Sequence, residues 1–373
     1  MFQEKIASRQ LFNIFFIMRT TIVISILPVL TVAQARQDAW LVAIITFFTS
    51  AVFVYLIGRL ALNFPDKNIV QYSRELLGNW PGGLLSLLFL GLFLLMGATD
   101  LRIYGEVLRT IFLPETPLVV ILGSMVIVAI MVVYAGLEPL GRMTDLIFPV
   151  FTLAVLFTLF FPIVETDFGN LLPVLYGGWR PVLFASLTPT AIAVQYANLA
   201  ILVPSVVEPR ETLRAALNSL LWASIILVLA AVIVIAVLGA DEGAHAFFPV
   251  FKMVRAVRIS EFLERFEFFP TFAWGLGLFI TLAVNLYSLS KGLSQLCSFK
   301  DHRPFLLPLA VILGTLALQG YNDSLEIRNF FQPQIIAPAL FFVFLFPVIV
   351  LWIAYFLKRR KNSVALPEDE RRG

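Results

Sequence analysis

Two charged side chains lie deep inside apolar stretches of this sequence, and they are the first candidates for chemistry. Arg19 lies about midway between Ser8 and Pro28, and Asp100 lies near the middle of the apolar stretch 83–112. A charged side chain at such a depth in hydrocarbon is costly unless it is paired or hydrated. The sequence therefore predicts an Arg19–Asp100 ion pair, which would serve either as a structural brace or as a gating or carboxylate-binding charge.

The apolar stretch 186–204 (SLTPTAIAVQYANLAILVP) is unusual because polar side chains run along its middle. In hydrocarbon, each of these groups must find a partner inside the protein. A proline also frees a backbone carbonyl one turn earlier, which a ligand or a neighbouring helix can satisfy. We interpret the stretch as an interrupted helix that lines a central binding site, although ordinary interhelical hydrogen bonds use the same residue types. The residues concerned are Thr188, Pro189 and Thr190, with Gln195, Tyr196 and Asn198 as candidate ligand-binding residues.

Two tyrosines in other apolar stretches are further candidates for the site. Tyr104 follows Asp100 by one helical turn, and Tyr287 lies beside several hydroxyl side chains. On a helix, residues one turn apart share a face, so Tyr104 and Asp100 would point into the same space.

Charge spacing predicts two clamps besides the Arg19–Asp100 pair. Arg102 and Glu106 are four residues apart, which places them on one face of a helix and allows an ion pair. Arg142 and Asp145, three residues apart, predict a similar structural clamp.

Residue types needed for metal, disulfide or hydrolytic chemistry are scarce. Cys297 is the single cysteine, and the two histidines, His245 and His302, fall in predicted loops without ligand spacing around them. The formal net charge of +3 comes largely from loops and the C-terminal tail, where it reports on membrane orientation. The sequence thus predicts no enzyme, no metal site, no cofactor and no nucleic-acid partner.

The elements that position these residues are membrane-spanning helices. Of the 373 residues, 60% are hydrophobic and 14% are charged, which is more apolar surface than a soluble core can bury. The sequence therefore predicts an all-α polytopic membrane protein in contact with the lipid bilayer, with a single transmembrane domain over 1–373. Ten spans are expected, at about 10–33, 39–63, 83–112, 117–134, 142–163, 182–204, 213–239, 268–296, 303–320 and 334–357.

The N-terminus also has some features of a signal peptide, because basic residues precede an apolar run and 33–35 (AQA) fits a cleavage site. The length of the run and its interruption by Arg19 favour a retained first helix instead. Basic residues concentrate in alternate loops, which predicts that both termini and the tail 359–373 are cytoplasmic. Two sets of five spans, each opening with a polar-interrupted helix, predict inverted repeats at about 8–165 and 180–358.

One charged segment does not fit a span. In 249–266 (PVFKMVRAVRISEFLERF), basic residues recur every three positions while the apolar ones fall on a different arc. This pattern predicts an amphipathic helix at the outer interface. It would be either a surface connector or a lid over an outward-facing vestibule.

Several stretches, in order along the whole chain, resemble the spore germination permeases, the B subunits of germinant receptors. They are 63–69 (NFPDKNI) with 77–78, 113–117 (LPETP), 134–138 (YAGLE) with 141–142, and 262–267 (FLERFE) with Trp274. The resemblance implies the amino acid–polyamine–organocation superfamily and a leucine-transporter-type fold of two inverted five-helix repeats with broken helices one and six. It also implies partners, namely an A subunit and a lipoprotein C subunit in the spore inner membrane.

The resemblance places a small nutrient germinant, often an amino acid, near the breaks in spans one and six. In span one the corresponding stretch before Pro28 has no glycine, and its candidate ligand-binding residues are Thr20, Thr21, Val23 and Ser25. In span six, Tyr196 and Asn198 stand where the family often has a glycine and a glutamate. These departures leave open a smaller or less ionic ligand, and also a subunit that has lost ligand binding.

We therefore expect a transporter-like receptor subunit that binds a small germinant at the membrane midplane and triggers germination with its partners. One alternative is an independent secondary transporter for an amino acid or related solute, with proton coupling through Asp100. Another is a structural or channel-forming subunit without a ligand.

Overall fold

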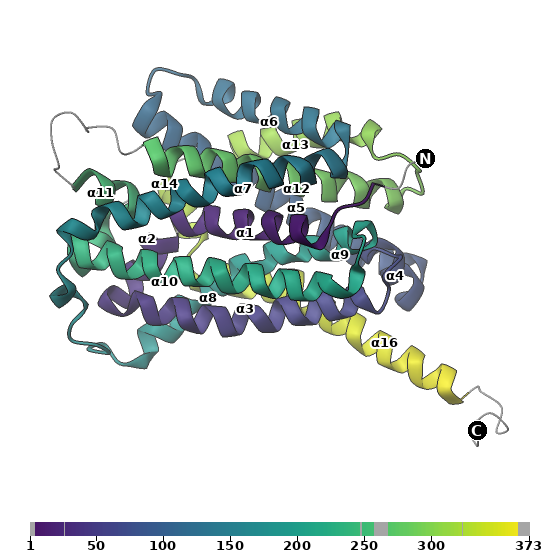
Figure 1. Cartoon of the computed structure of the whole chain (residues 1–373). Helices are drawn as coiled ribbons and strands as arrows, with labels where there is room; N and C mark the ends of the chain where they lie inside the picture. The colour runs from purple at the N-terminus through teal and green to yellow at the C-terminus, as the bar shows by residue number, and fades with distance from the viewer. Residues whose placement is uncertain (1–3, 26, 247, 257–267, 323, 365–373) are drawn as a thin grey trace.

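The structure is a computed structural model that describes residues 4–25, 27–246, 248–256, 268–322 and 324–364. Helices make up most of the described residues, and Ile6 and Val206 form an isolated parallel bridge. The long helices lie side by side as a bundle, and its first and last described segments reach the same end (Figure 1). The prediction of an all-α polytopic membrane protein is confirmed.

The first predicted span is described as two helical segments on either side of residue 26, which lies outside the described residues, and the next four are single helices. The two segments are α1 (Ser8–Ser25) and α2 (Leu27–Ala35). Spans two to five are α3 (Ala39–Leu62), α5 (Asn79–Val107), α6 (Leu118–Ala135) and α7 (Leu137–Phe160). Before α5 lies the short amphipathic helix α4 (Ile69–Leu77), whose first turn is capped by the side chain of Asn68.

The sixth span is divided, as predicted. It consists of α8 (Trp179–Ile192), a 3-10 turn (Ala193–Asn198) and α9 (Leu199–Leu202). The remaining spans are α10 (Thr212–His245), α12 (Phe268–Leu296), α13 (Leu306–Gln319), and α15 (Pro333–Leu340) followed by α16 (Phe346–Val364). Short connecting helices are α11 (Pro249–Ala256) and α14 (Ser324–Phe330), and single turns occupy Arg36–Asp38, Leu108–Phe112, Phe161–Glu165, Phe168–Leu171, Val203–Ser205, Pro209–Glu211, Arg303–Phe305 and Phe341–Leu345.

Eight of the described segments are long and apolar enough to cross a membrane, one of which runs through α2 and α3 together. The helix α13 falls in a shorter apolar segment, Arg303–Gln319. The expected ten spans are consistent with this set when α1 is joined to α2 and α13 is added. The repeat boundaries at about 8–165 and 180–358 stay a prediction.

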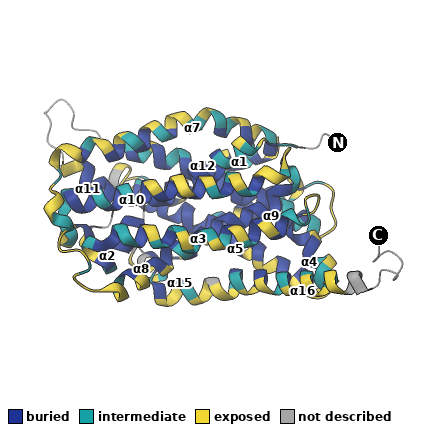
Figure 2. Cartoon of the chain, turned by 60° about the horizontal axis from the view of Figure 1, so that its bottom comes forward, coloured by how far each residue is buried: buried dark blue, intermediate teal, exposed yellow. Residues whose placement is uncertain are grey.

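Burial separates the central helices from the lipid-facing ones (Figure 2). In the span through α8 and α9, 94% of the most apolar window is buried, and in α12 the share is 83%. In α6 the share is only 28%, although α6 is more hydropathic than either. A span that is both less hydropathic and more buried is packed against protein, which is where polar side chains can find partners.

The turn between α6 and α7 needs a glycine, and it anchors the N-terminal segment. Gly136 has φ of +109°, a conformation that side chains with a Cβ rarely adopt. A Cβ at this position would also lie 2.6 Å from Oε1 of Glu4. The turn within 134–138 therefore depends on the glycine, because Gly136 has no Cβ and so leaves room for the side-chain carboxylate of Glu4.

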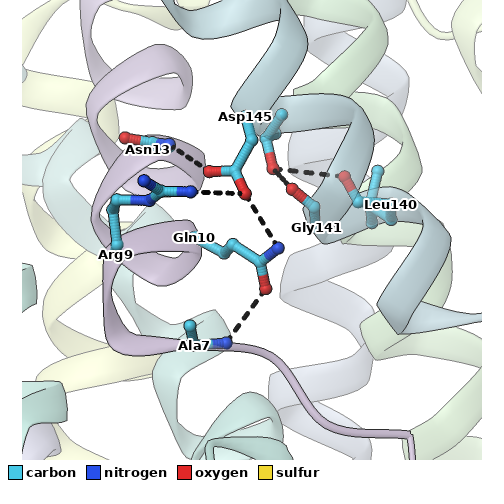
Figure 3. A network of polar contacts seen from close by, with 8 residues as sticks. Ala7, Arg9, Gln10, Asn13, Leu140, Gly141 and Asp145 are labelled. Carbon is cyan, nitrogen blue, oxygen red and sulfur yellow. Dashed lines mark hydrogen bonds and ion pairs between the residues drawn. The ribbon is translucent and has the colours of Figure 1, made fainter.

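The predicted Arg142–Asp145 clamp is wrong, because each residue has another partner. Arg142 pairs with Glu138 one turn earlier on α7, at 2.6 Å. Asp145 faces α1 and accepts hydrogen bonds from Arg9 at 3.2 Å, Gln10 at 3.0 Å and Asn13 at 2.8 Å (Figure 3). Asp145 therefore joins α7 to α1, whereas the sequence spacing suggested a bond within one helix.

The amphipathic segment at 249–266 is described only in its first part. There, α11 buries Phe251, Met253 and Val254 and leaves Lys252 and Arg255 exposed, as its pattern predicts. The remainder of the predicted lid, 257–266, lies outside the described residues.

Candidate functional site

The break in span six creates a free backbone acceptor at the centre of the bundle. At the end of α8, the Ala193 N–H bonds to the Thr190 carbonyl, three residues back instead of four. This change of helix type releases the Pro189 carbonyl from the α-helical ladder. Arg19 on α1 takes the place of the missing backbone donor, because its Nη2 donates a hydrogen bond to the Pro189 carbonyl at 2.9 Å.

Arg19 and Asp100 are both buried, at 1% and 8% exposure, but they do not form the expected ion pair in the described structure. The break in span six supplies Arg19 with a different acceptor, and this is the physical reason for the difference. Arg19 Nη1 and Asp100 Oδ2 are left without a hydrogen-bond partner among the described residues. Such atoms are rare in proteins and mark a place where water, an ion or a ligand belongs.

A small cavity lies between spans one, three and eight, next to the end of α8. It contains about 10 Å³ of free volume, which is room for one water molecule. The residues around it are Thr21 and Ile22 from span one, Met96, Thr99, Asp100 and Ile103 from α5, Ile192 from α8, Trp274, Leu278 and Thr281 from α12, and Phe331. A ligand larger than water needs these helices to separate, so this conformation is closed.

Aromatic side chains cover the cavity on one side. The ring of Trp274 meets that of Tyr104 edge-on at 5.4 Å and that of Phe251 from α11 at 6.1 Å. Phe331 lies between α14 and α15, and its carbonyl accepts a hydrogen bond from Thr188 Oγ1 at 2.9 Å. The predicted site residue Tyr104 thus contacts the cavity wall through Trp274.

At the bottom of the cavity, span one and α12 approach each other closely. A Cβ on Gly277 would overlap Thr21 Oγ1, so only glycine leaves room for the threonine here. The Thr21 hydroxyl donates to the Ile17 carbonyl on its own helix at 2.6 Å. Both residues therefore belong to one tightly packed contact next to the cavity.

A second polar cluster joins the break in span six to α12. Asn198 Nδ2 donates to the Gln195 carbonyl at 2.9 Å and to Asn285 Oδ1 at 3.1 Å. Both polar atoms of the Gln195 side chain, and also Asn198 Oδ1, Asn285 Nδ2, Ser288 Oγ and Thr20 Oγ1, are buried without a hydrogen-bond partner among the described residues. The cluster has more donors and acceptors than the protein satisfies, as a site for a polar guest would.

Two of the predicted ligand-binding tyrosines have structural contacts. Tyr196 stacks on Phe15 at 4.8 Å, and its hydroxyl shares a hydrogen bond of 3.1 Å with Ser219 Oγ. The Tyr287 hydroxyl donates to Glu4 Oε2 at 3.3 Å, away from the cavity residues. Of the span-one candidates, Val23 is buried, whereas the side chain of Ser25 lies outside the described part of the chain.

The N-terminal segment closes the bundle at the end where the chain begins. Glu4 Oε2 accepts hydrogen bonds from the Leu137 N–H at 3.2 Å and from Tyr287. Lys5 Nζ donates to the Pro204 carbonyl at 3.1 Å, and the Ile6 N–H to the Ser205 carbonyl at 2.9 Å. The strap 4–7 thereby links both sides of the bundle below the cavity.

At the opposite end, a vestibule of about 320 Å³ lies beside α2 and α8. Three carboxamide side chains, from Gln34, Gln332 and Gln334, line it together with Leu30, Ala33 and Phe184. Phe331 lines the closed cavity and the next residue, Gln332, lines the vestibule, so this segment borders both spaces.

Sequence reasoning missed the aromatic and hydroxyl wall of the cavity. Phe331 has no signal of its own in a chain with 36 phenylalanines, and Trp274 was noted only as part of the resemblance, without a role in the site. Met96 and Ile103 lie one turn before and after Asp100, so helical periodicity from the buried aspartate could have found these two wall residues, whereas Thr99 lies directly beside Asp100 in sequence and has no such signal. Asn285 was recognisable as an amide inside an apolar stretch, by the same rule that selected Asn198.

Comparison with known proteins gives a consistent result along almost the whole chain. Residues 5–324 match the sequence model of a family described as spore germination protein. Spore germination protein KB of Bacillus subtilis (strain 168) is 27% identical over 369 residues, 97% of each chain. Spore germination protein YndE of the same organism is 25% identical over 334 residues, covering 88% of this chain and 91% of its own.

Solved structures of transporters share the fold at low sequence identity. MhsT in complex with L-phenylalanine superposes with a TM-score of 0.68 at 12% identity, over 91% of this chain and 88% of MhsT. A Na⁺-coupled sialic acid symporter in a substrate-bound, outward-open state gives a TM-score of 0.67 at 10% identity, over 93% and 80% of the two chains. The fold is therefore the leucine-transporter type, with two inverted five-helix repeats and broken first and sixth spans.

Proposed function

This chain belongs to the spore germination protein family, and we propose that it is the transporter-like membrane subunit of a spore germinant receptor. In this proposal it binds a small nutrient germinant, an amino acid or a similar molecule, near the midplane. The names of its relatives support the role in germination, and the fold it shares with MhsT supports a small-solute site at the two helix breaks.

The observation that carries the proposal is a closed cavity lined by Asp100, together with buried polar atoms on Asp100 and on Arg19 of span one that have no hydrogen-bond partner among the described residues. Asp100 Oδ2 can accept a hydrogen bond from an ammonium or hydroxyl group of a ligand, and Arg19 Nη1 can donate one to a carboxylate. The residues Thr21 and Thr99 add hydroxyl groups to the cavity wall. A germinant with one positive and one negative or polar end would satisfy these groups together.

Binding would act by shifting a conformational equilibrium. The cavity has a free volume of only about 10 Å³, so a ligand must bind to an arrangement with a wider cavity. The ligand shifts the equilibrium toward that arrangement by as much as its affinity for the wider state exceeds its affinity for the closed one. The vestibule lined by Gln34, Gln332 and Gln334 is the entry route in this proposal, and Phe331 is its inner barrier. The segment 249–266 remains a candidate lid, since Phe251 supports Trp274 from outside.

The proposed setting is the spore inner membrane, with both termini in the cytoplasm. The loops and helix ends that are richest in basic residues, such as those around Lys67, Arg142 and Arg303, belong to the end of the bundle where the first and last described segments lie (Figure 1), which supports a cytoplasmic face there by the positive-inside rule. The proposed partners are a germinant-receptor A subunit and a lipoprotein C subunit.

Thermal unfolding of the purified chain with a panel of amino acids, sugars and nucleosides tests the ligand site. A true germinant should raise the unfolding temperature in a saturable way, and at a hundred times its Kd the stabilisation is about 2.7 kcal/mol. Thr21→Val should weaken this response. The matched control is Thr158→Val, because Thr158 also donates to a carbonyl one turn earlier but lies outside the cavity. Equal responses in the two variants would place the ligand elsewhere.

The rival function is independent transport, which the likeness to solute transporters favours. Concentrative uptake of a radiolabelled ligand by proteoliposomes that contain this chain alone would overturn the receptor proposal. Ligand-dependent stabilisation without uptake would support it.

A further inference from the structure

A groove separate from the central cavity runs between α3 and α16. Its volume is about 540 Å³, and its walls are Tyr55, Leu56, Arg59 and Asn63 on α3 and Ile349, Trp352, Ile353, Tyr355, Phe356 and Arg359 on α16. Both helices end at the same end of the bundle as α4 and the two termini (Figure 1). The groove is thus on the outside of the protein, at the level where a membrane protein meets one leaflet.

The chemistry of the groove changes along its length. Ile349 and Ile353 lie at one end, and Arg59, Asn63 and Arg359 lie at the other. At 1.5 Å per residue, Ile349 and Arg359 are about 15 Å apart along α16, which is close to half the hydrocarbon thickness of a bilayer. A guest that fits this gradient has an acyl part and an anionic head.

Among the described residues, no acid forms an ion pair with the two arginines. Arg59 and Arg359 are exposed, and neither forms an ion pair with any described residue. The nearby carboxylate of Glu75 is already engaged, by Lys67 at 2.6 Å and by Lys358 at 3.2 Å. The polar end of the groove therefore carries two positive charges that an external anion can satisfy.

The aromatic walls of the groove are held in place by the protein itself. Trp352 Nε1 donates a hydrogen bond to the Leu56 carbonyl at 3.1 Å, which ties α16 to α3. Trp352 also stacks on Phe356 at 5.3 Å, while Tyr355 packs edge-on against Phe64 at 5.8 Å. Tryptophan and tyrosine at this level are typical of the membrane interface, and here they form a preformed slot beside the arginines.

We propose that this groove binds an anionic glycerophospholipid from the leaflet at this end of the protein. The phosphate lies between Arg59 and Arg359, and an acyl chain runs along Ile349 and Ile353. Basic pockets between spanning helices with an apolar continuation recognise such headgroups. A bound lipid would hold α16 against α3 independently of any ligand in the central cavity.

The test uses the full chain in detergent, with native mass spectrometry and thermal unfolding in the presence of phosphatidylglycerol or phosphatidylcholine. Phosphatidylglycerol should remain bound and raise the unfolding temperature, and phosphatidylcholine should do so much less. Arg59→Gln and Arg359→Gln should each weaken phosphatidylglycerol binding about fivefold. The control is Arg210→Gln, which removes an arginine that is exposed, lies outside the groove and forms no ion pair with another described residue.

A second variant tests the apolar end without changing charge. Ile353→Trp fills the groove and should also reduce phosphatidylglycerol binding, while Ile312→Trp on the exposed face of α13 should not. Equal lipid retention by the double arginine variant and the Arg210→Gln control would overturn the proposal. So would equal stabilisation by glycerol phosphate, which lacks acyl chains. If the arginine variants keep the lipid but lose a co-expressed A subunit, the groove is a protein interface instead.

Discussion

Arg19 donates a hydrogen bond to the Pro189 carbonyl at 2.9 Å, and this bond joins the unbroken part of span one to the place where span six unwinds. Its other terminal nitrogen, Nη1, is buried without a partner among the described residues. A charge that is taken out of water and only partly paired opposes folding. The presence of Arg19 is therefore better explained by a function than by a contribution to the stability of the fold.

The first prediction compares Arg19→Met with Arg102→Met. The guanidinium of Arg102 is fully engaged, by Glu106 at 2.8 Å and by the carbonyls of Ala317 and Leu318. Arg102→Met removes this buried ion pair and both carbonyl hydrogen bonds, so it should lower the free energy of unfolding by about 3–5 kcal/mol. Arg19→Met should change it by less than about 1 kcal/mol, or raise it, yet abolish ligand-dependent stabilisation. Chemical denaturation in detergent measures both, and a large loss in Arg19→Met would make Arg19 a structural brace.

The second prediction concerns the contact between span one and α12. Gly277→Ala should destabilise the protein by about 1–3 kcal/mol, because the new methyl group overlaps the Thr21 hydroxyl. Gly123→Ala on α6 is the control, since a Cβ there meets no atom within 4 Å. Thermal unfolding should show the loss only in Gly277→Ala.

Removing the clashing hydroxyl offers an internal check on the second prediction. The double variant Gly277→Ala with Thr21→Ala should recover part of the lost stability, because the hydroxyl is the closest obstacle. If the double variant loses at least as much free energy of unfolding as the two single variants lose in total, overlap at Thr21 is not the cause of the loss in Gly277→Ala.

The sequence was sufficient to predict the spans and the break in span six, because these depend on apolar length and on local polar residues. It was not sufficient for the partner of Arg19. Two opposite charges in neighbouring helices made Asp100 the expected partner, but the unwinding after Ile192 supplied a backbone carbonyl instead. Backbone acceptors carry no signal in the sequence, since every residue has one.

The partners of Tyr287 and Asp145 could not be predicted from the sequence either, because both are far away along the chain. Both were interpreted from their neighbours in sequence, yet Tyr287 bonds to Glu4, and Asp145 to residues of α1. Which helices lie next to each other depends on how the whole bundle packs. A spacing rule within one helix contains no information about that packing.

The third prediction concerns Phe331 as the barrier between the vestibule and the cavity. In a Cys297→Ser background, which removes the exposed native thiol, a cysteine introduced by Thr99→Cys should react slowly with a membrane-impermeant thiol reagent added from the vestibule side. Adding Phe331→Ala should raise the rate about tenfold or more, because the large ring no longer covers the cavity. Phe330→Ala is the matched control, since Phe330 packs on Phe331 but does not line the cavity. Equal rates for the two alanine variants would remove Phe331 from the entry route.

The fourth prediction is a pH dependence at the strap 4–7. Burial lowers the pKa of His302 below its ordinary value of 6.5, with Lys291 acting in the same direction and Glu4 and Asp301 opposing it. The unfolded chain therefore binds a proton at a higher pH than the folded one. The stabilising effect of neutral His302 is present above about pH 6.5 and is lost as the pH falls through the folded pKa.

His302→Gln should abolish this step, so that its unfolding temperature falls less than that of the unmodified chain between pH 7 and pH 5. Tyr287 lies beside His302, with 5.3 Å between the ring centroids, and donates its hydroxyl to Glu4. His245→Gln is the control, because His245 is exposed at the end of α10 and, within the described part of the chain, its ring bonds to the Asp241 carbonyl of its own helix. A pH profile that is unchanged in His302→Gln but altered in His245→Gln would assign the effect to the opposite end of the protein.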